Sequence, residues 1–211
     1  RVPDKQGKMG DVVLGYDTLE EYLRFTPYFG ATIGRFAGPL REARFTLDGV
    51  EYPLAANEGR HHLHGGRRGF DKVLWWAEPF EAGDEAGVRL NYTSPDGEEG
   101  YPGRLSVNLI GRLTADNALD FDYVATTDRP TMINLTHHGY FNLAGQGCGD
   151  IQDHVVELRA DRYHLIDGDL VPTGEVAPVA GTPLDLNRPV RLGDRLRADH
   201  EQVRRAGGFD Q

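Results

Sequence analysis

The chain has 211 residues, 39% of them hydrophobic, which is enough to bury one sizeable core in one or two domains. Its 23 basic and 33 acidic residues leave a net charge of -10, which repels nucleic-acid phosphates and favours a neutral small-molecule ligand. No apolar run approaches the roughly 18 residues of a membrane helix, so we expect no membrane span.

The chain contains one cysteine, Cys148. A single thiol cannot close an intramolecular disulfide bond, so nothing argues for an oxidising compartment and a cytoplasmic location is expected. We expect this thiol to be buried or inert.

The N-terminal part of the sequence predicts one strand and the one clear helix. "DVVLGY", residues 11–16, is typical of a strand bounded by aspartate and glycine. "DTLEEYLRF", residues 17–25, predicts a helix with Asp17 or Thr18 as its N-cap and acidic residues in its first turn. Its apolar side would be formed by Leu19, Tyr22 and Leu23.

The next clear signal is a hairpin in "RFTLDGVEYPL". Asp48-Gly49 supplies the positive φ angles that a tight turn needs between the apolar-alternating segments Phe45–Leu47 and Val50–Tyr52. The sequence therefore predicts two antiparallel strands joined by a two-residue turn.

Period-two alternation continues along the chain. Strands are predicted at "GVRLNYTS" (87–94) and "HVVELRA" (154–160), and a hairpin joins residues 105–109 to 119–125 through "ADNA". Because short strands and turns run throughout, with 27 glycines and 12 prolines, we predict an all-β antiparallel sandwich or barrel. With no repeat or linker to divide it, residues 1–211 are expected to form a single domain.

The segment "HHLHGGRRGFDK", residues 61–72, concentrates three of the eight histidines. On extended chain His61, His62 and His64 alternate between faces and cannot all reach one ion, so we expect no metal site. The Gly-Gly pair that follows allows a close approach of the backbone. That approach suits either the rim of a ligand site or a tight turn stabilised by a histidine.

A second histidine group lies in "INLTHHGYFNLAG", residues 133–145, where His137 and His138 are adjacent. Neighbouring side chains on a strand point to opposite faces, so only one of the two imidazoles can enter a given site. An imidazole titrates near neutrality and can donate a proton to a ring or leaving oxygen. For either residue alone, a hydrogen-bonded core histidine is the alternative.

Other candidate acids and bases are less specific. The charge run of Asp96, Glu98 and Glu99 is most simply a solvated turn, and Asp210 lies in the closing "GGFDQ". No Ser-His-Asp motif, phosphate-binding glycine loop or cysteine nucleophile stands out.

Six blocks of the sequence resemble, in the same order, those of the aldose 1-epimerases, the galactose mutarotase family. The blocks are "GATIGRFAG", "NEGRHHLHGGRRGFDKVLW", "SPDGEEGYPGRLSV", "DRPTMINLTHHGYFNLAG", "LVPTGE" and "GGFD". The resemblance covers essentially the whole chain and implies a large antiparallel β-supersandwich. It also implies interconversion of the α and β anomers of a free aldohexose, galactose or glucose, with no metal or organic cofactor.

The resemblance assigns roles to individual residues. His138 corresponds to the acid that protonates the ring oxygen, and His64 to an imidazole that hydrogen-bonds the ring oxygen or a neighbouring hydroxyl. Tyr140 would line the same site, and Asp210 would accept hydrogen bonds from sugar hydroxyls. A general base takes the proton of the anomeric hydroxyl.

Two features depart from the family pattern. Family members carry a sugar-contacting arginine at the position of Pro39, and Arg41, on the same side of an extended strand, is the candidate to replace it. The family base is a C-terminal glutamate without a matching segment in this sequence, so we expect the domain to continue beyond both ends of residues 1–211. Otherwise Glu98 or Glu175 would be the candidate base.

Two other functions fit part of these observations. A non-catalytic carbohydrate-binding module would keep the histidines without the base. A hexose-6-phosphate epimerase would need cationic partners for its phosphate, which the acidic charge disfavours, and "GGRRG" at residues 65–69 is the nearby basic candidate. The oligomeric state and the preferred hexose stay open.

Overall fold

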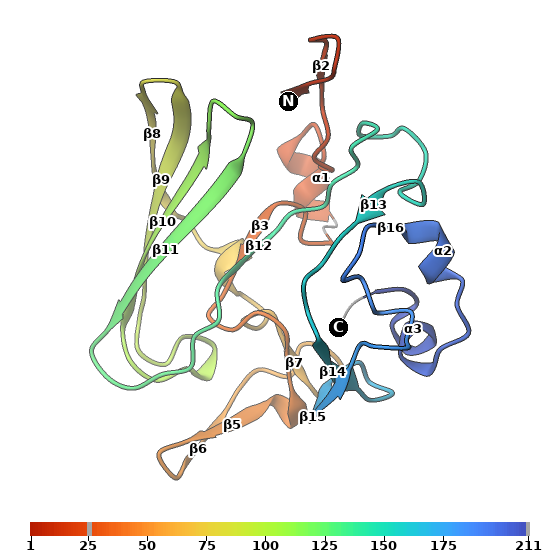
Figure 1. Cartoon of the computed structure of the whole chain (residues 1–211). Coiled ribbons are helices and arrows are strands. Elements are labelled where there is room, and N and C mark those ends of the chain that lie inside the picture. Colours follow the sequence, from red (N-terminus) through yellow and green to blue (C-terminus); the bar gives the residue numbers. More distant parts are fainter. Residues whose placement is uncertain (25–26, 210–211) are drawn as a thin grey trace. The chain divides into compact units, whose positions relative to one another are not determined.

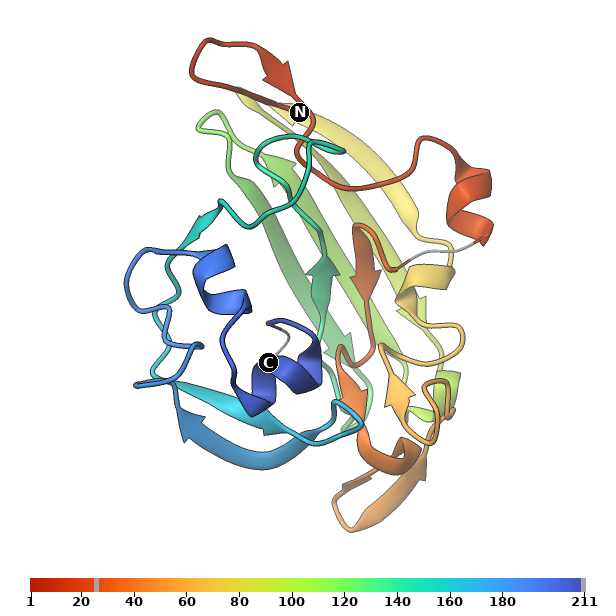
Figure 2. The ribbon, with the colours of Figure 1, turned by 90° about the vertical axis from the view of Figure 1, so that its right-hand side faces the viewer.

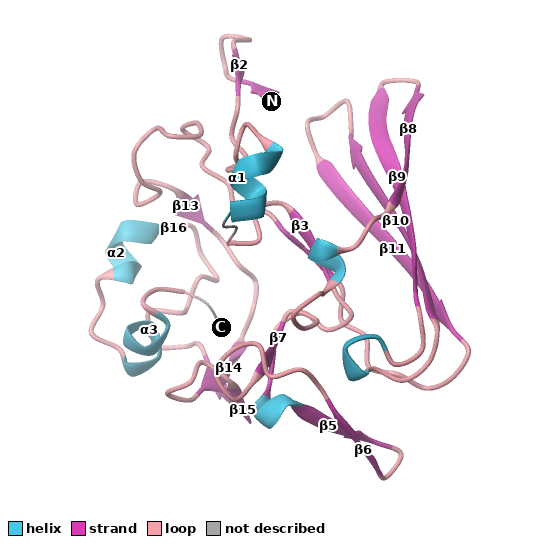
Figure 3. Cartoon of the chain, turned by 180° about the vertical axis from the view of Figure 1, so that it is seen from behind, coloured by secondary structure: helices cyan, strands magenta, loops and turns pink. Residues whose placement is uncertain are grey.

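A computed structural model describes residues 1–24 and 27–209. The chain divides into two compact units. The larger unit comprises Gly15–Gly139 with Val2, and the smaller unit comprises Pro3–Leu14 and Tyr140–Gln211 with Arg1. Strands and loops make up most of both units, and the helices are short (Figure 3). No helix in the described part of the chain is long and apolar enough to cross a membrane.

The larger unit consists of antiparallel strand pairs and one four-stranded sheet (Figure 1). Its strands are β3 (Ala31–Ile33), β4 (Pro39–Leu40), β5 (Arg44–Leu47), β6 (Val50–Pro53), β7 (His62–Leu63), β8 (Trp76–Ala82), β9 (Glu85–Ser94), β10 (Leu105–Leu113), β11 (Leu119–Thr127) and β12 (Thr136–His138). Its helices are α1 (Leu19–Arg24) and the single 3-10 turns η1 (Arg41–Ala43), η2 (Phe70–Lys72) and η3 (Glu98–Gly100). The predicted all-β antiparallel class is confirmed.

The four-stranded sheet has the order β11-β10-β9-β8 and is antiparallel throughout. The hairpin predicted at 105–125 is confirmed as β10 and β11, in which Leu109 lies opposite Tyr123. The Thr114 N–H closes its turn by donating to the Ala118 carbonyl at 2.9 Å. The predicted strand at 87–94 is confirmed within β9.

One face of β10 forms the core of the larger unit. Leu105, Val107 and Leu109 are at most 2% exposed, whereas Asn108 between them is exposed, which is the period-two pattern of a half-buried strand. Phe70 of η2 packs against Leu105 and Val107. Burial of side chains of this size contributes about 1.5–3 kcal/mol each. This packing joins the segment after His64 to the sheet.

The second predicted hairpin is also confirmed. β5 and β6 pair with Leu47 opposite Val50, and Asp48 and Gly49 adopt φ angles of 52° and 78°. Both turn residues are therefore in the left-handed region, as a two-residue turn between twisted strands requires.

Two short ladders carry the histidines. β12 pairs with β3, which places His138 opposite Ala31 and His137 opposite Thr32. β7 pairs with β4, which places His62 opposite Leu40. Figures 1 and 2 show β3 and β12 side by side next to the four-stranded sheet.

The predicted helix at 17–25 is confirmed as α1 up to Arg24, and Phe25 lies outside the described residues. Thr18 caps it: the Glu21 N–H donates to the Thr18 hydroxyl at 3.4 Å, and the Glu21 carboxylate accepts the Thr18 N–H at 3.1 Å.

The predicted apolar side of α1 is wrong. Leu19 and Leu23 are 68% and 77% exposed, and Tyr22 alone of the three packs, edge to face with Tyr16 at 5.1 Å. A helix of six residues turns too few times to carry a continuous apolar stripe.

The smaller unit combines paired strands with two short helices. Its elements are β2 (Met9–Gly10), β13 (Val155–Val156), β14 (Arg162–Ile166), β15 (Pro172–Pro178), β16 (Val190–Arg191), α2 (Leu192–Leu196) and α3 (Glu201–Ala206). The strand pairs are β13 with β16 and β14 with β15, and β2 pairs with β1 (Val2–Pro3).

The sequence did not predict α2 and α3, which have five and six residues. A tertiary clamp supports α3: the buried Gln202 side chain accepts the Ile166 N–H at 2.8 Å and donates to the Ile166 carbonyl at 3.1 Å. Helices this short show no full apolar period and depend on such contacts.

Two strand predictions fail in whole or in part. The segment 11–16 forms no regular strand among the described residues. Its one β-type pairing there is an isolated antiparallel bridge between Val13 and Phe141. The predicted strand at 154–160 is reduced to Val155–Val156. Cys148 is exposed, so burial of this thiol is excluded, and its inertness stays a prediction.

Candidate active site

His64 follows β7 at a sharp turn of the chain. His64, Gly65 and Gly66 all have positive φ, at 53°, 86° and 107°. A Cβ on Gly65 would lie 1.7 Å from the carbonyl oxygen of Gly34, and one on Gly66 would lie 2.2 Å from a carboxylate oxygen of Glu99. Gly65 therefore lets the His64 turn pack directly on Gly34, which follows β3, and Gly66 leaves room for the Glu99 side chain.

Glu99 stabilises the same turn from outside. Its carboxylate accepts the backbone N–H groups of Arg67 at 3.1 Å and Arg68 at 2.9 Å. The nearby Glu98 accepts a 2.6 Å hydrogen bond from the Tyr92 hydroxyl. The charge run is a turn with Asp96 exposed, as predicted, but Glu98 and Glu99 are half-buried and act as hydrogen-bond acceptors instead of being solvated.

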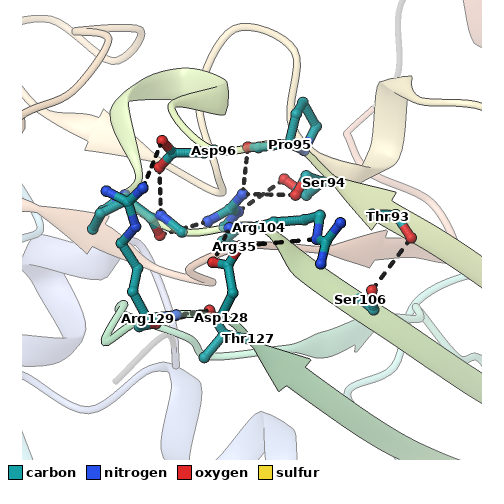
Figure 4. Close-up of polar contacts among 12 residues, drawn as sticks. Arg35, Thr93, Ser94, Pro95, Asp96, Arg104, Ser106, Thr127, Asp128 and Arg129 are labelled. Carbon is teal, nitrogen blue, oxygen red and sulfur yellow. Dashed lines mark hydrogen bonds and ion pairs between the residues drawn. The ribbon is translucent and has the colours of Figure 1, made fainter.

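Arg35 is buried just after β3 and connects β3 to the end of β9 and to the loop that follows β9 (Figure 4). Its guanidinium donates to the Ser94 hydroxyl at 2.8 Å and to the carbonyls of Pro95 at 2.7 Å and Pro102 at 3.0 Å. Burial lowers the pKa of Arg35, and the carboxylate of Glu98 opposes that shift. A buried cation satisfied in this way fixes the backbone on which the His64 turn rests.

Asp96 completes the network. It accepts the Gly103 N–H at 2.6 Å and forms an ion pair with Arg129 at 3.1 Å. Figure 4 shows the ion pair. The acidic residues at 96–99 thus have structural partners up to 33 positions away in sequence.

The hydrogen bond of His64 defines its tautomer. The Gly38 N–H donates to Nδ1 of His64 at 3.0 Å, so Nδ1 is an acceptor and the proton of the neutral ring is on Nε2. The His64 ring consequently presents an N–H donor on its other edge.

His137 and His138 point to different surroundings, as their adjacency on a strand predicts. The His137 ring stacks on Phe121 of the sheet at 3.9 Å, with an interplanar angle of 18°. Burial lowers the pKa of His137, and the neighbouring His138 lowers it further. The His138 ring contacts His64 instead, at 5.2 Å and 81°.

Tyr28 completes a cluster that we call the imidazole cluster, formed by Tyr28, His64 and His138. The Tyr28 ring lies edge-on to His64 at 4.8 Å and tilted against His138 at 5.5 Å. All three side chains are half-buried. Sequence reasoning missed Tyr28 because its partners are 36 and 110 positions away, and no local pattern in "PYFG" signals their contact.

The other two histidines of the 61–72 segment are structural. His61 accepts the Glu42 N–H at 3.1 Å. His62 is completely buried and bonds the Ala55 carbonyl at 2.8 Å and the Tyr101 hydroxyl at 2.7 Å. Among residues 1–24 and 27–209 no group of three metal-binding side chains converges.

The contacts given above for the described residues do not place the other predicted site residues at the imidazole cluster. Arg41 is exposed in η1, so the premise that an extended strand continues from Pro39 through Arg41 is wrong, because β4 ends at Leu40.

Tyr140 belongs to the smaller unit, where its carbonyl accepts the Leu14 N–H at 2.9 Å. Asp210 lies outside the described residues. Exposed Glu175 is on β15.

The fold is of the galactose mutarotase type. The crystal structure of galactose 1-epimerase from Lactobacillus acidophilus NCFM superposes with a TM-score of 0.87 at 31% identity, covering 95% of this chain and 59% of that one. The model of the aldose 1-epimerase family matches residues 1–209, and the chain belongs to that family.

Curated relatives agree with this assignment. A galactose mutarotase from Sus scrofa is 49% identical over 209 residues, covering 99% of this chain and 58% of that protein. An aldose 1-epimerase from Escherichia coli K12 is 34% identical over 210 residues, covering 100% of this chain and 59% of that protein. The chain thus spans somewhat less than three fifths of the length of these relatives.

Proposed function

We propose that the protein is an aldose 1-epimerase, which interconverts the α and β anomers of free aldohexoses such as galactose or glucose. Membership of the family and the names of the relatives support this activity. The observation that carries it is the edge-on pair of His64 and His138, whose ring centroids are 5.2 Å apart. Two imidazoles at this distance can reach one sugar oxygen and its neighbour.

The hydrogen bond from Gly38 assigns a role to His64. His64 accepts the Gly38 N–H on Nδ1, and protonation there would break that bond, so His64 acts as a neutral donor through Nε2. The family resemblance assigns protonation of the ring oxygen to the other ring, His138. A positioned general acid of this kind contributes about 10²–10⁴ to the rate.

The reaction needs one proton in and one proton out. The family resemblance assigns removal of the anomeric hydroxyl proton to a glutamate. His138 protonates the ring oxygen as the C1–O5 bond breaks, which leaves the open-chain aldehyde. C1 turns about the C1–C2 bond, and the C5 hydroxyl attacks the other face of the aldehyde. The C5 hydroxyl returns its proton to His138, while the glutamate returns its proton to the new anomeric oxygen.

Further contacts to the sugar remain part of the proposal. Tyr140 would line the site, Asp210 would accept hydrogen bonds from sugar hydroxyls, and Arg41 would act from η1 in place of the arginine that relatives carry at Pro39. The single cysteine is compatible with a cytoplasmic location.

A phosphorylated sugar is disfavoured as substrate. The backbone N–H groups of Arg67 and Arg68, which would suit a phosphate, donate to Glu99. The Arg67 guanidinium donates to the Ala56 carbonyl at 2.7 Å. The candidate phosphate site at residues 65–69 is thus engaged in holding its own turn.

The experiment is polarimetry of freshly dissolved α-galactose and α-glucose with the full-length protein. We expect the optical rotation to reach its equilibrium value faster with protein than without. Equal rates of change of optical rotation with and without protein, together with sugar binding measured by calorimetry, would favour the carbohydrate-binding module over the enzyme. Faster equilibration of glucose 6-phosphate than of glucose would favour the phosphate-sugar alternative.

A further inference from the structure

The backbone of Tyr28 is linked through Ala31 of β3 to β12, the strand that carries His138. Its φ angle is 65°, which is uncommon for a bulky residue and marks a tight turn held by its surroundings. The Ala31 N–H donates to the Tyr28 carbonyl at 3.0 Å, and the Gly30 N–H donates to the His138 carbonyl at 3.0 Å. Ala31 also lies opposite His138 in the β3–β12 ladder. The turn therefore places the Tyr28 ring in a fixed relation to His138.

The Tyr28 ring is in turn shared by both imidazoles. It meets His64 at 4.8 Å with the rings nearly perpendicular, at 85°, and meets His138 at 5.5 Å with the rings tilted by 32°. Edge-to-face and tilted contacts at these separations are favourable aromatic geometries. One ring thus restricts the side-chain torsions of two imidazoles that come from different ladders.

A third contact orients the Tyr28 ring itself. The Lys72 ammonium lies 5.3 Å from the ring centroid, within the range of a cation–π contact. Lys72 forms an ion pair with Asp71, whose side chain is only 4% exposed. Because η2 packs into the core through Phe70, the Lys72 contact connects Tyr28 to a rigid part of the unit.

We propose that Tyr28 is a positioning residue of the active site, which holds His64 and His138 at the mutual orientation that proton transfer to a sugar oxygen requires. This inference rests on the proposed epimerase function. The phenol is uncharged in this role: burial raises the pKa of Tyr28, and the charges of Asp71 and Glu58 add to the shift. The Tyr28 ring contacts both imidazoles.

The kinetic test compares Tyr28→Leu with Tyr28→Phe in the full-length protein. Loss of the ring should lower kcat by about tenfold to a hundredfold, because small misplacements of reacting groups have effects of that size. KM should change much less, and Tyr28→Phe should restore most of the lost kcat. Tyr52→Leu is the matched control, since the half-buried Tyr52 ring stacks on Phe45 instead, at 5.1 Å, and its kcat should equal the parent's.

A double-mutant cycle separates positioning from general damage. If Tyr28 acts through His138, then Tyr28→Leu should lower kcat far less in a His138→Ala background than in the parent, since groups that act as a unit are non-additive. Equal fold losses in both backgrounds would overturn the proposal. So would a fall in thermal stability of Tyr28→Leu that accounts for its whole loss of activity.

A second readout does not depend on activity. In protein with isotope-labelled histidines, nuclear Overhauser contacts between the rings of His64 and His138 should be present in the parent, Tyr28→Phe and Tyr52→Leu, and weakened in Tyr28→Leu. Unchanged contacts in Tyr28→Leu would refute the positioning role. A parent that shows these contacts and fails to accelerate mutarotation would instead refute the proposed function alone.

Discussion

The backbone N–H of Gly38 donates a 3.0 Å hydrogen bond to Nδ1 of His64. This bond leaves Nε2 as the donor nitrogen of a neutral His64 ring, and the centroid of the His138 ring is 5.2 Å from that of His64. A backbone group thereby distinguishes two otherwise similar imidazoles. In the proposed mechanism His64 is the neutral hydrogen-bond donor and His138 the acid.

The tautomer of His64 is the first prediction. Nitrogen NMR of histidine-labelled protein at neutral pH should show Nδ1 of His64 as unprotonated and Nε2 as protonated, because the Gly38 N–H occupies the lone pair of Nδ1. His64→Gln, which keeps an amide donor, should retain more activity than His64→Ala. A proton on Nδ1 would contradict the division of roles between His64 and His138.

The close approach at Gly65 gives the second prediction. Gly65→Ala should lower the free energy of unfolding by about 3 kcal/mol or more, from the sum of a left-handed φ and overpacking against the Gly34 carbonyl. Gly83→Ala is the matched control, since Gly83 also has positive φ, at 61°, but faces open space. It should cost about 1–2 kcal/mol. Equal losses in urea titrations of the two variants would show that the contact with Gly34 is not tight.

The third prediction is a dependence of stability on pH. Burial lowers the pKa of His62, although its bond to the Ala55 carbonyl acts in the opposite direction. Burial also lowers the pKa of His137. Below about pH 6.5, the ordinary pKa of histidine, the unfolded chain takes up protons that the folded chain resists. Stability should therefore be complete above that pH and decline on acidification.

Urea titrations between about pH 5.5 and 7.5 isolate this effect, because carboxylates titrate below that window. His62→Gln, which keeps polar groups but cannot titrate there, should show a smaller decline than the parent. A stability that rises on acidification, or an identical slope in His62→Gln, would argue against neutral buried imidazoles.

Local sequence patterns predicted the parts of the fold that depend on near neighbours. The Asp48-Gly49 turn follows from two residues whose φ angles the hairpin demands. The different surroundings of His137 and His138 follow from the alternation of side chains along a strand. In both cases the relevant interaction lies within a few positions of the chain.

Features that depend on distant partners could not be predicted in this way. Glu99 in a run of charges resembles a solvated turn until the N–H groups of Arg67 and Arg68 meet it. No local pattern distinguishes Tyr28, because its contact with His138 depends on the pairing of β3 with β12. Arg41 lies in η1 because the chain turns after Leu40 instead of continuing as a strand. Tertiary pairing rather than local pattern decides these positions.

The central claim, that His138 is the acid and His137 a packing residue, is tested most directly by polarimetry of matched variants in the full-length protein. His138→Ala should lower kcat for mutarotation of α-galactose by at least about tenfold to a hundredfold, consistent with loss of a general acid. His137→Asn should have a mild effect, since its ring serves to stack on Phe121. A reversal of severity between the two variants, or an undiminished kcat in His138→Ala, would contradict the account.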